Sequence, residues 1–258
     1  MLTEESRHHD FPALTDMAYL NTAAESIPPV SVHKALAQYA RDKGLGMRGR
    51  VPHNETMEAC REVAARMVGL QTEEVSFCSC SSEAYNLLAN ALHLGADDEV
   101  VITDLDFPAG ATPWLNAAEP PQTRLWQARD GALDANDLSA LLNERTRLVQ
   151  VSLVSFYNGH RLDWSPFIET VRTHAPQAIV AVDVTQAFGR VELDCTDFDI
   201  LISSTHKWTL GVHGGCVVGI PENRENGRAL TTHAGGWYHL QNAFEADRFK
   251  RTVRKPGA

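Results

Sequence analysis

The fold is decided by residues 181–215, AVDVTQAFGRVELDCTDFDILISSTHKWTLGVHGG. An apolar segment ends at Asp183, and a second, residues 200–204, leads directly to His206 and Lys207. Polar residues at the carboxyl ends of neighbouring strands are where open α/β sheets bind ligands. A lysine placed there, beside Trp208 and a glycine-rich stretch, is partly desolvated, which lowers its pKa and favours the neutral amine that forms Schiff bases. Taken alone, such a lysine is more often a surface cation.

The chain around this stretch alternates short β-rich runs with helical patterns. Several runs are apolar throughout, as strands covered by helices on both faces must be. We therefore expect a mostly parallel central sheet. Upstream, the patterns predict helices over residues 30–42 and 54–68, and in the second we expect Met57, Cys60, Ala64 and Met67 to form a buried stripe. The predicted strands are 75–78, 100–103, 123–127, 147–154, 179–184, 198–204 and 216–220.

Composition narrows the class of protein. The 258 residues are 43% hydrophobic and 22% charged, with no run of eighteen apolar residues, which predicts a globular protein and excludes a membrane span. The net charge of −10 argues against nucleic acid and anionic membranes as partners. Five scattered cysteines are typical of reduced thiols. The polar, acidic first residues do not resemble an export signal. We expect a cytoplasmic protein.

Three other kinds of site, for nicotinamide binding, ester hydrolysis and metal binding, are suggested by short motifs, but the surrounding sequence does not support them. Gly44, Gly46 and Gly49 match the G-x-G-x-x-G pattern of nicotinamide-binding folds, but they follow a helical pattern where a strand is needed. The sequence His-Gly-Gly at residues 213–215 resembles an esterase oxyanion loop, yet no G-x-S-x-G elbow exists. We also expect no metal site, because His8, His9 and His53 lack ligand spacing.

Two further strand ends change the interpretation of Lys207. The predicted strand 75–78 is followed by Ser81 and Ser82 at the start of an apolar helix, where hydroxyls and free N–H groups can bind a phosphate. The predicted strand 100–103 is followed by Phe107, on which a flat ring could stack. A phosphate cradle, a stacking ring, a strand-end carboxylate and a Schiff-base lysine together describe a site for pyridoxal 5′-phosphate.

Five motifs, spread over almost the whole chain, then identify a family resemblance. The chain resembles the class V aminotransferases among the fold-type I pyridoxal-phosphate enzymes. Within that group it is similar to the branch of cysteine desulfurases, selenocysteine lyases and isopenicillin N epimerase-like proteins. The motifs are residues 19–25 (YLNTAAE), 82–86 (SEAYN), 151–159 (VSLVSFYNG), Asp183-x-x-Gln186 and Ser204-x-His206-Lys207.

The resemblance implies a role for each matching residue. Lys207 would carry the cofactor as a Schiff base and later move the substrate Cα proton. Asp183 would keep the pyridinium nitrogen protonated, because a protonated ring is the electron sink for the Cα carbanion. Gln186 would donate to the ring oxygen O3′, and Phe107 would stack on the ring. The resemblance assigns phosphate binding to Ser81, Ser82, Ser204 and His206.

The chain departs from the desulfurase pattern in three places. Desulfurases stack a histidine where this chain has Phe107, which leaves the substrate open to amino acids other than cysteine. Phe156 stands where they have an asparagine near O3′, although Asn158 lies close by. Family members also continue into a Gly-Thr-Pro-Asn-like loop and a C-terminal domain, whereas this chain ends at Ala258. The resemblance therefore implies either a fragment or a shortened natural product.

Together these observations predict an α/β protein with the large domain of pyridoxal-phosphate-dependent transferases and without their small C-terminal domain. We expect residues 1–30 to form a segment at the active-site rim and residues 31–258 the cofactor-binding domain. The expected function is lyase, aminotransferase or epimerase chemistry at the Cα of a small amino-acid substrate, in a homodimer. The alternative is a truncated or degenerate, noncatalytic paralogue that binds the cofactor.

Overall fold

A single seven-stranded sheet organises the fold. It is seen in a computed structural model that describes residues 3–232, 234–236 and 244–245. The strand order is β1-β7-β6-β5-β4-β2-β3. The strands are β1 (Val75–Cys78), β2 (Glu99–Thr103), β3 (Gln122–Trp126), β4 (Thr146–Ser152), β5 (Ile179–Asp183), β6 (Ile200–Ser204) and β7 (Cys216–Gly219).

Strand direction divides the sheet into a parallel body and an antiparallel edge. β6, β5, β4, β2 and β3 run parallel to one another, whereas β7 is antiparallel to both β6 and β1. The predicted mostly parallel sheet is thereby confirmed. Because β4, β5 and β6 are adjacent and parallel, their carboxyl ends meet at one edge of the sheet.

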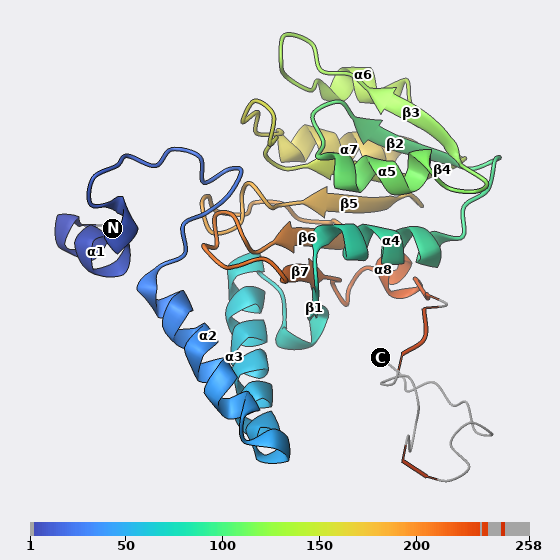
Figure 1. The fold of residues 1–258 in the computed structure, drawn as a ribbon. Helices are drawn as coiled ribbons and strands as arrows, with labels where there is room; N and C mark the ends of the chain where they lie inside the picture. The colour runs from blue at the N-terminus through green and yellow to red at the C-terminus, as the bar shows by residue number, and fades with distance from the viewer. Residues whose placement is uncertain (1–2, 233, 237–243, 246–258) are drawn as a thin grey trace.

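Helices cover both faces of the sheet, as the apolar runs predicted (Figure 1). Neighbouring strand residues alternate between two cores. Val101 and Val149 pack with α3, α6 and α7, whereas Val100 and Leu148 pack with α4 and α5. Within the described residues, no helix is both long and apolar enough to cross a bilayer. The α-helices are α1 (Glu4–Asp10), α2 (Val30–Lys43), α3 (Arg50–Val68), α4 (Ser81–Leu92), α5 (Pro108–Leu115), α6 (Ala135–Ser139), α7 (Trp164–His174) and α8 (Glu225–Arg228).

The expected buried stripe on α3 is wrong. Met57 and Met67 are 44% and 45% exposed and Cys60 is exposed as well, so Ala64 is the one member that is buried. The reason is where the helix lies. Only its C-terminal end packs against β1 and β7, through residues such as Ala65, while α2 and the rest of α3 extend away from the sheet (Figure 1).

The G-x-G-x-x-G match forms the turn between two helices, as its context indicated. It spans the end of α2 and a 3₁₀ turn, η2 (Gly46–Gly49), that leads into α3. Gly49 is a glycine because the chain folds back closely there. A Cβ at this position would lie 1.8 Å from the Asp42 carbonyl oxygen.

This close approach makes Gly49→Ala a test of the helix turn. We expect the substitution to lower the free energy of unfolding by about 1–3 kcal/mol, because backbone must move to admit the methyl group. Urea unfolding measures the loss. Gly95→Ala is the matched control, since a Cβ at Gly95 would have no atom within 4 Å. Equal stability of the two variants would contradict the close-packing argument.

Candidate functional site

A cavity of about 410 Å³ opens at the carboxyl ends of β4, β5 and β6. The helices α4 and α5 begin beside it, and the segment before α2 passes over it. The predicted site residues Ser81, Phe107, Asp183, Gln186, Ser204, His206 and Lys207 all line this cavity, together with Asn21, Ala23, Ala24, Glu25, Ser152, Val154, Phe156, Thr185 and His213. Ser82 does not line it and is exposed on the first turn of α4.

Asp183 ends β5 and is held by two donors. The Thr185 N–H donates to its Oδ1 atom at 2.8 Å, and the Tyr85 hydroxyl donates to its Oδ2 atom at 2.8 Å. Burial, reinforced by the Asp183 charge, raises the pKa of Tyr85 well above its ordinary value, so the phenol stays protonated. The carboxylate is thus fixed in place with its charge facing the cavity.

Lys207 presents a buried amine with no partner of its own. The residue is 7% exposed, and the described part of the chain gives its Nζ atom neither a hydrogen bond nor an ion pair. Nζ lies 4.9 Å from the centroid of the Phe107 ring, which covers one side of it. Burial lowers the pKa of Lys207, against the charges of Asp183 and Glu25, which raise it. The environment therefore favours the neutral amine more than water does.

One end of the cavity is suited to an anion. Helix α4 starts at Ser81, and no side chain caps its N-terminus, so its first N–H groups are available to a ligand. Ser204 and His206 approach from the end of β6. Burial, with contributions from the neighbouring His213 and Lys207, lowers the pKa of His206, although Glu25 opposes the shift.

Gln186 is held by contacts that leave it one free donor. Its Nε2 group donates to the Ala23 carbonyl at 2.8 Å, and its Oε1 atom accepts from the Trp208 indole N–H at 2.7 Å. An amide NH₂ has two protons, so one remains for a ligand in the cavity. This geometry is compatible with the donor role that the resemblance implied.

The two phenylalanines that replace polar residues of the desulfurase pattern lie next to each other. Phe107 and Phe156 both line the cavity, with ring centroids 5.1 Å apart and planes at 88°. Asn158 points elsewhere, because its Nδ2 group donates to the Gly131 carbonyl at 2.7 Å. This wall of the cavity is therefore apolar, and Asn158 does not replace the missing asparagine.

Sequence reasoning missed Tyr85 and Asp106. Tyr85 reaches Asp183 from one turn inside α4, and Asp106 is buried next to Phe107. The one local signal was a carboxylate directly before the stacking phenylalanine, at a strand end. The Thr103 N–H donates to Asp106 at 3.1 Å, and the N–H and hydroxyl of Ser152 donate at 2.7 and 3.0 Å.

Asp106 has a strongly shifted pKa. Burial raises it from an ordinary value of 3.8 to about 7, against the hydrogen bonds from Thr103 and Ser152, and the nearby Asp183 charge adds to the rise. The unfolded chain loses this proton near its ordinary pKa, about 4. Between these two values the folded state binds one more proton than the unfolded state, so stability falls as pH rises.

Asp106→Asn should flatten this part of the stability profile. In the wild type we expect a slope of up to about −1.4 kcal/mol per pH unit from Asp106 between about pH 4 and pH 7. The asparagine variant has no such titration. Chemical unfolding at several pH values measures the difference between the two proteins. Asp104→Asn, at an exposed position of the same sheet edge, should keep the wild-type slope. Parallel profiles for wild type and Asp106→Asn would contradict the raised pKa.

Comparison with known proteins decides the family. The aminotransferase class-V family model matches residues 18–250. The chain belongs to this family. It is 29% identical over 224 residues to a probable cysteine desulfurase of Methanothermobacter thermautotrophicus, covering 83% of this chain and 55% of that protein. It is 32% identical over 220 residues to a cysteine desulfurase of Cronobacter sakazakii, covering 77% and 53%.

A solved structure shows the same fold. A C-DES mutant with glycine covalently linked to its pyridoxal-phosphate cofactor superimposes with a TM-score of 0.84, at 20% identity, over 97% of this chain and 67% of that one. The predicted fold class and family resemblance are thus confirmed. The chain spans about half the length of the curated relatives it matches.

Proposed function

We propose that the chain binds pyridoxal 5′-phosphate in this cavity and acts at the Cα of an amino acid, as a lyase, aminotransferase or epimerase. The observation that carries the proposal is the buried amine of Lys207, which makes no hydrogen bond or ion pair within the described residues and shares one cavity with the fixed Asp183 carboxylate. The desulfurase relatives and the cofactor of the superimposed C-DES structure support it.

The residues present fit this cofactor. A volume of about 410 Å³ lies within the usual range of small-molecule sites, about 300–1,000 Å³. The uncapped N-terminus of α4 offers N–H groups to a phosphate, and Lys207 has no competing partner within the described residues. Phe107 offers a partly exposed ring face beside the amine.

When bound, the cofactor supplies an aldehyde for the amine and a ring that accepts electrons from a Cα carbanion. Lys207 would hold the cofactor through its Nζ atom, and the same amine would afterwards hold or return the Cα proton. The Asp183 carboxylate would keep the ring nitrogen protonated, because a negative charge beside it stabilises the added proton. Ser81, Ser204 and His206 would bind the phosphate. The apolar wall of Phe107 and Phe156 limits water around the reacting atoms.

Borohydride trapping tests the proposal directly. Protein loaded with pyridoxal phosphate is reduced, digested and mapped by mass spectrometry, and we expect the cofactor mass on the peptide that contains Lys207. Exchange of the Cα proton in D₂O, followed by NMR over a panel of amino acids, tests the catalytic part, because transamination, epimerisation and β-elimination each require removal of the Cα proton. An adduct on another lysine would overturn the site. An adduct on Lys207 without turnover of any amino acid would favour the noncatalytic alternative.

We also propose a homodimer. The two helices that extend from the sheet, and the turn between them, expose large apolar side chains, including Met47 at 75% in the turn, and much exposed apolar surface is typical of interaction sites. Sedimentation velocity should show a dimer, and Met47→Asp should shift it towards monomer. A monomeric wild type would overturn this part. The exposed apolar residues are Leu36, Tyr39, Leu45, Met47, Val51, Met57, Val63 and Met67.

The remaining proposals concern organisation and location. We propose that residues 1–30 form the rim of the site and that the cofactor-binding domain begins at residue 31. Support comes from Asn21 and Glu25, which line the cavity. Part of the proposed domain, residues 233, 237–243 and 246–258, lies outside the described residues. A cytoplasmic location is supported by the five cysteines, all of which are free thiols.

A further inference from the structure

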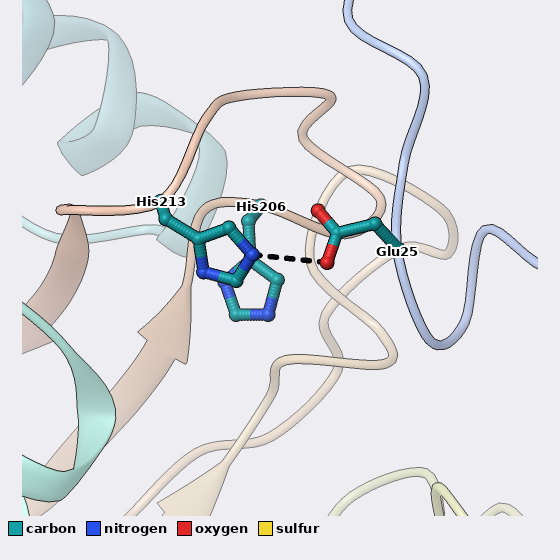
Figure 2. A group of neighbouring side chains, drawn as sticks. All are labelled: Glu25, His206 and His213. Atoms are coloured by element: carbon teal, nitrogen blue, oxygen red, sulfur yellow. Dashed lines mark hydrogen bonds and ion pairs between the residues drawn. The ribbon is translucent and has the colours of Figure 1, made fainter.

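Three side chains gather at the mouth of the cavity from distant parts of the chain. Glu25 belongs to the segment before α2, His206 follows β6, and His213 lies in the loop before β7. Figure 2 shows the three turned toward one another, with the Nε2 atom of His213 bonded to a carboxylate oxygen of Glu25 at 2.9 Å. One nitrogen or oxygen atom from each residue lies within 4.8 Å of the others.

The backbone that carries these residues is fastened by hydrogen bonds. The N–H and the hydroxyl of the buried Ser26 both donate to the His206 carbonyl, at 3.0 and 2.8 Å. The loop of His213 is closed by Thr205, whose N–H donates to the Gly215 carbonyl at 3.1 Å and whose carbonyl accepts from the Gly211 N–H at 2.9 Å. The backbone of these segments is therefore already ordered, and binding of a ligand by the three side chains would cost little further backbone entropy.

Two imidazoles and one carboxylate are a common donor set for zinc. Zinc–ligand bonds of about 2.0–2.2 Å in a tetrahedron place the ligand atoms roughly 3.4 Å apart. The rings of His206 and His213 are stacked, with centroids 4.1 Å apart and planes at 21°. Metal binding would require the two rings to turn out of this stacked arrangement so that one nitrogen of each faces the ion, and the exposed side chains of Glu25 and His213 have room to rotate. A fourth position remains open to water.

We propose that Glu25, His206 and His213 form a binding site for Zn²⁺ or a divalent metal ion with similar ligand preferences. Sequence reasoning expected no metal site because it weighed only His8, His9 and His53, and no local spacing connects residues 25, 206 and 213. The proposal has a consequence that rests on the proposed function. His206 would serve both the metal ion and the phosphate of the cofactor, so the two ligands would compete.

Calorimetric titration of the cofactor-free protein, without a histidine tag, with ZnCl₂ tests the site. We expect one zinc ion per chain in the wild type. His213→Gln and Glu25→Gln should each weaken zinc binding at least about 10-fold, because loss of a ligand costs no less than loss of a supporting hydrogen bond. Thermal unfolding without metal checks that both variants fold. Titration with Co²⁺ adds a readout, since its visible absorption is stronger in tetrahedral than in octahedral coordination.

His174→Gln is the matched control. His174 is an exposed histidine at the end of α7, and it lies outside the cavity. We expect its zinc affinity to equal that of the wild type. Unchanged affinity in His213→Gln and Glu25→Gln would overturn the proposal, as would an equal loss in His174→Gln, because binding would then be that of surface histidines in general.

Competition is measured separately from zinc binding. Saturation of the protein with pyridoxal phosphate should weaken zinc binding, and zinc should weaken cofactor binding by the same factor, since coupling between two ligands is reciprocal. Simultaneous, independent binding would overturn the competition but leave the zinc site. Zinc binding in a protein that fails to take up the cofactor would support the metal site and overturn the proposed function.

Discussion

Lys207→Ala should abolish borohydride-stable attachment of pyridoxal phosphate. The number of cofactors attached per chain should fall from one to none. In the wild type, Nζ is buried in the cavity without a partner in the described structure, and burial lowers its pKa, so it is the amine best prepared to react. A methyl group has no nitrogen to form the bond. Intact-protein mass spectrometry after reduction measures the result, and the visible absorption of the loaded protein should change with it.

The matched control for this prediction is Lys43→Ala. Lys43 ends α2, away from the cavity, and should keep full attachment. Circular dichroism checks that Lys207→Ala still folds, since alanine at a buried position removes packing as well as charge. An undiminished adduct in folded Lys207→Ala would show that another lysine carries the cofactor, and the proposed function would lose its central residue.

Asp183→Asn should raise the dissociation constant for pyridoxal phosphate by about 10–100-fold. In the proposed function the carboxylate pairs with the ring nitrogen, and a hydrogen bond to a charged group contributes about 1.5–3 kcal/mol. Asparagine keeps the shape but removes the charge. Fluorescence titration of the cofactor-free protein measures binding without reference to turnover, and any Cα proton exchange should fall as well, because a neutral ring is a weaker electron sink.

Asp104→Asn is the control for loss of a charge at this sheet edge. Asp104 follows β2, accepts a hydrogen bond from the Ala128 N–H and lies outside the cavity. Tyr85→Phe removes one donor to Asp183 and leaves the charge, so it separates positioning of the carboxylate from its electrostatic role. Equal cofactor affinity in wild type and Asp183→Asn would show that Asp183 does not pair with the ring.

The sheet could be predicted because its strands carry an unambiguous pattern. Every residue of β5 and β6 is buried, and a strand covered on both faces is apolar over most of its length, with polar residues at its end. The polar residues that follow such strands then lie at one edge by geometry. Lys207 and Asp183 were found for this reason, since each directly follows or ends a buried run.

Other features depend on contacts that no local pattern shows. The face of α3 that includes Met57 has helical spacing, but periodicity does not reveal that most of the helix extends past the edge of the sheet. Tyr85 looks like an ordinary core residue of α4 until its hydroxyl is seen at Asp183. Glu25 and His213 meet across 188 positions of sequence, and only the folded chain brings them together.

The hydrogen bonds between Ser26 and His206 join positions 180 residues apart. During translation, the segment that carries Ser26 leaves the ribosome early, whereas its partner is made only after most of the sheet has been synthesised. Contacts of such sequence separation form late, because a long loop must close first. We therefore expect the wall of the cavity formed by residues 21–25 to be completed late, since the binding site of a nascent chain needs its beginning to return to β6.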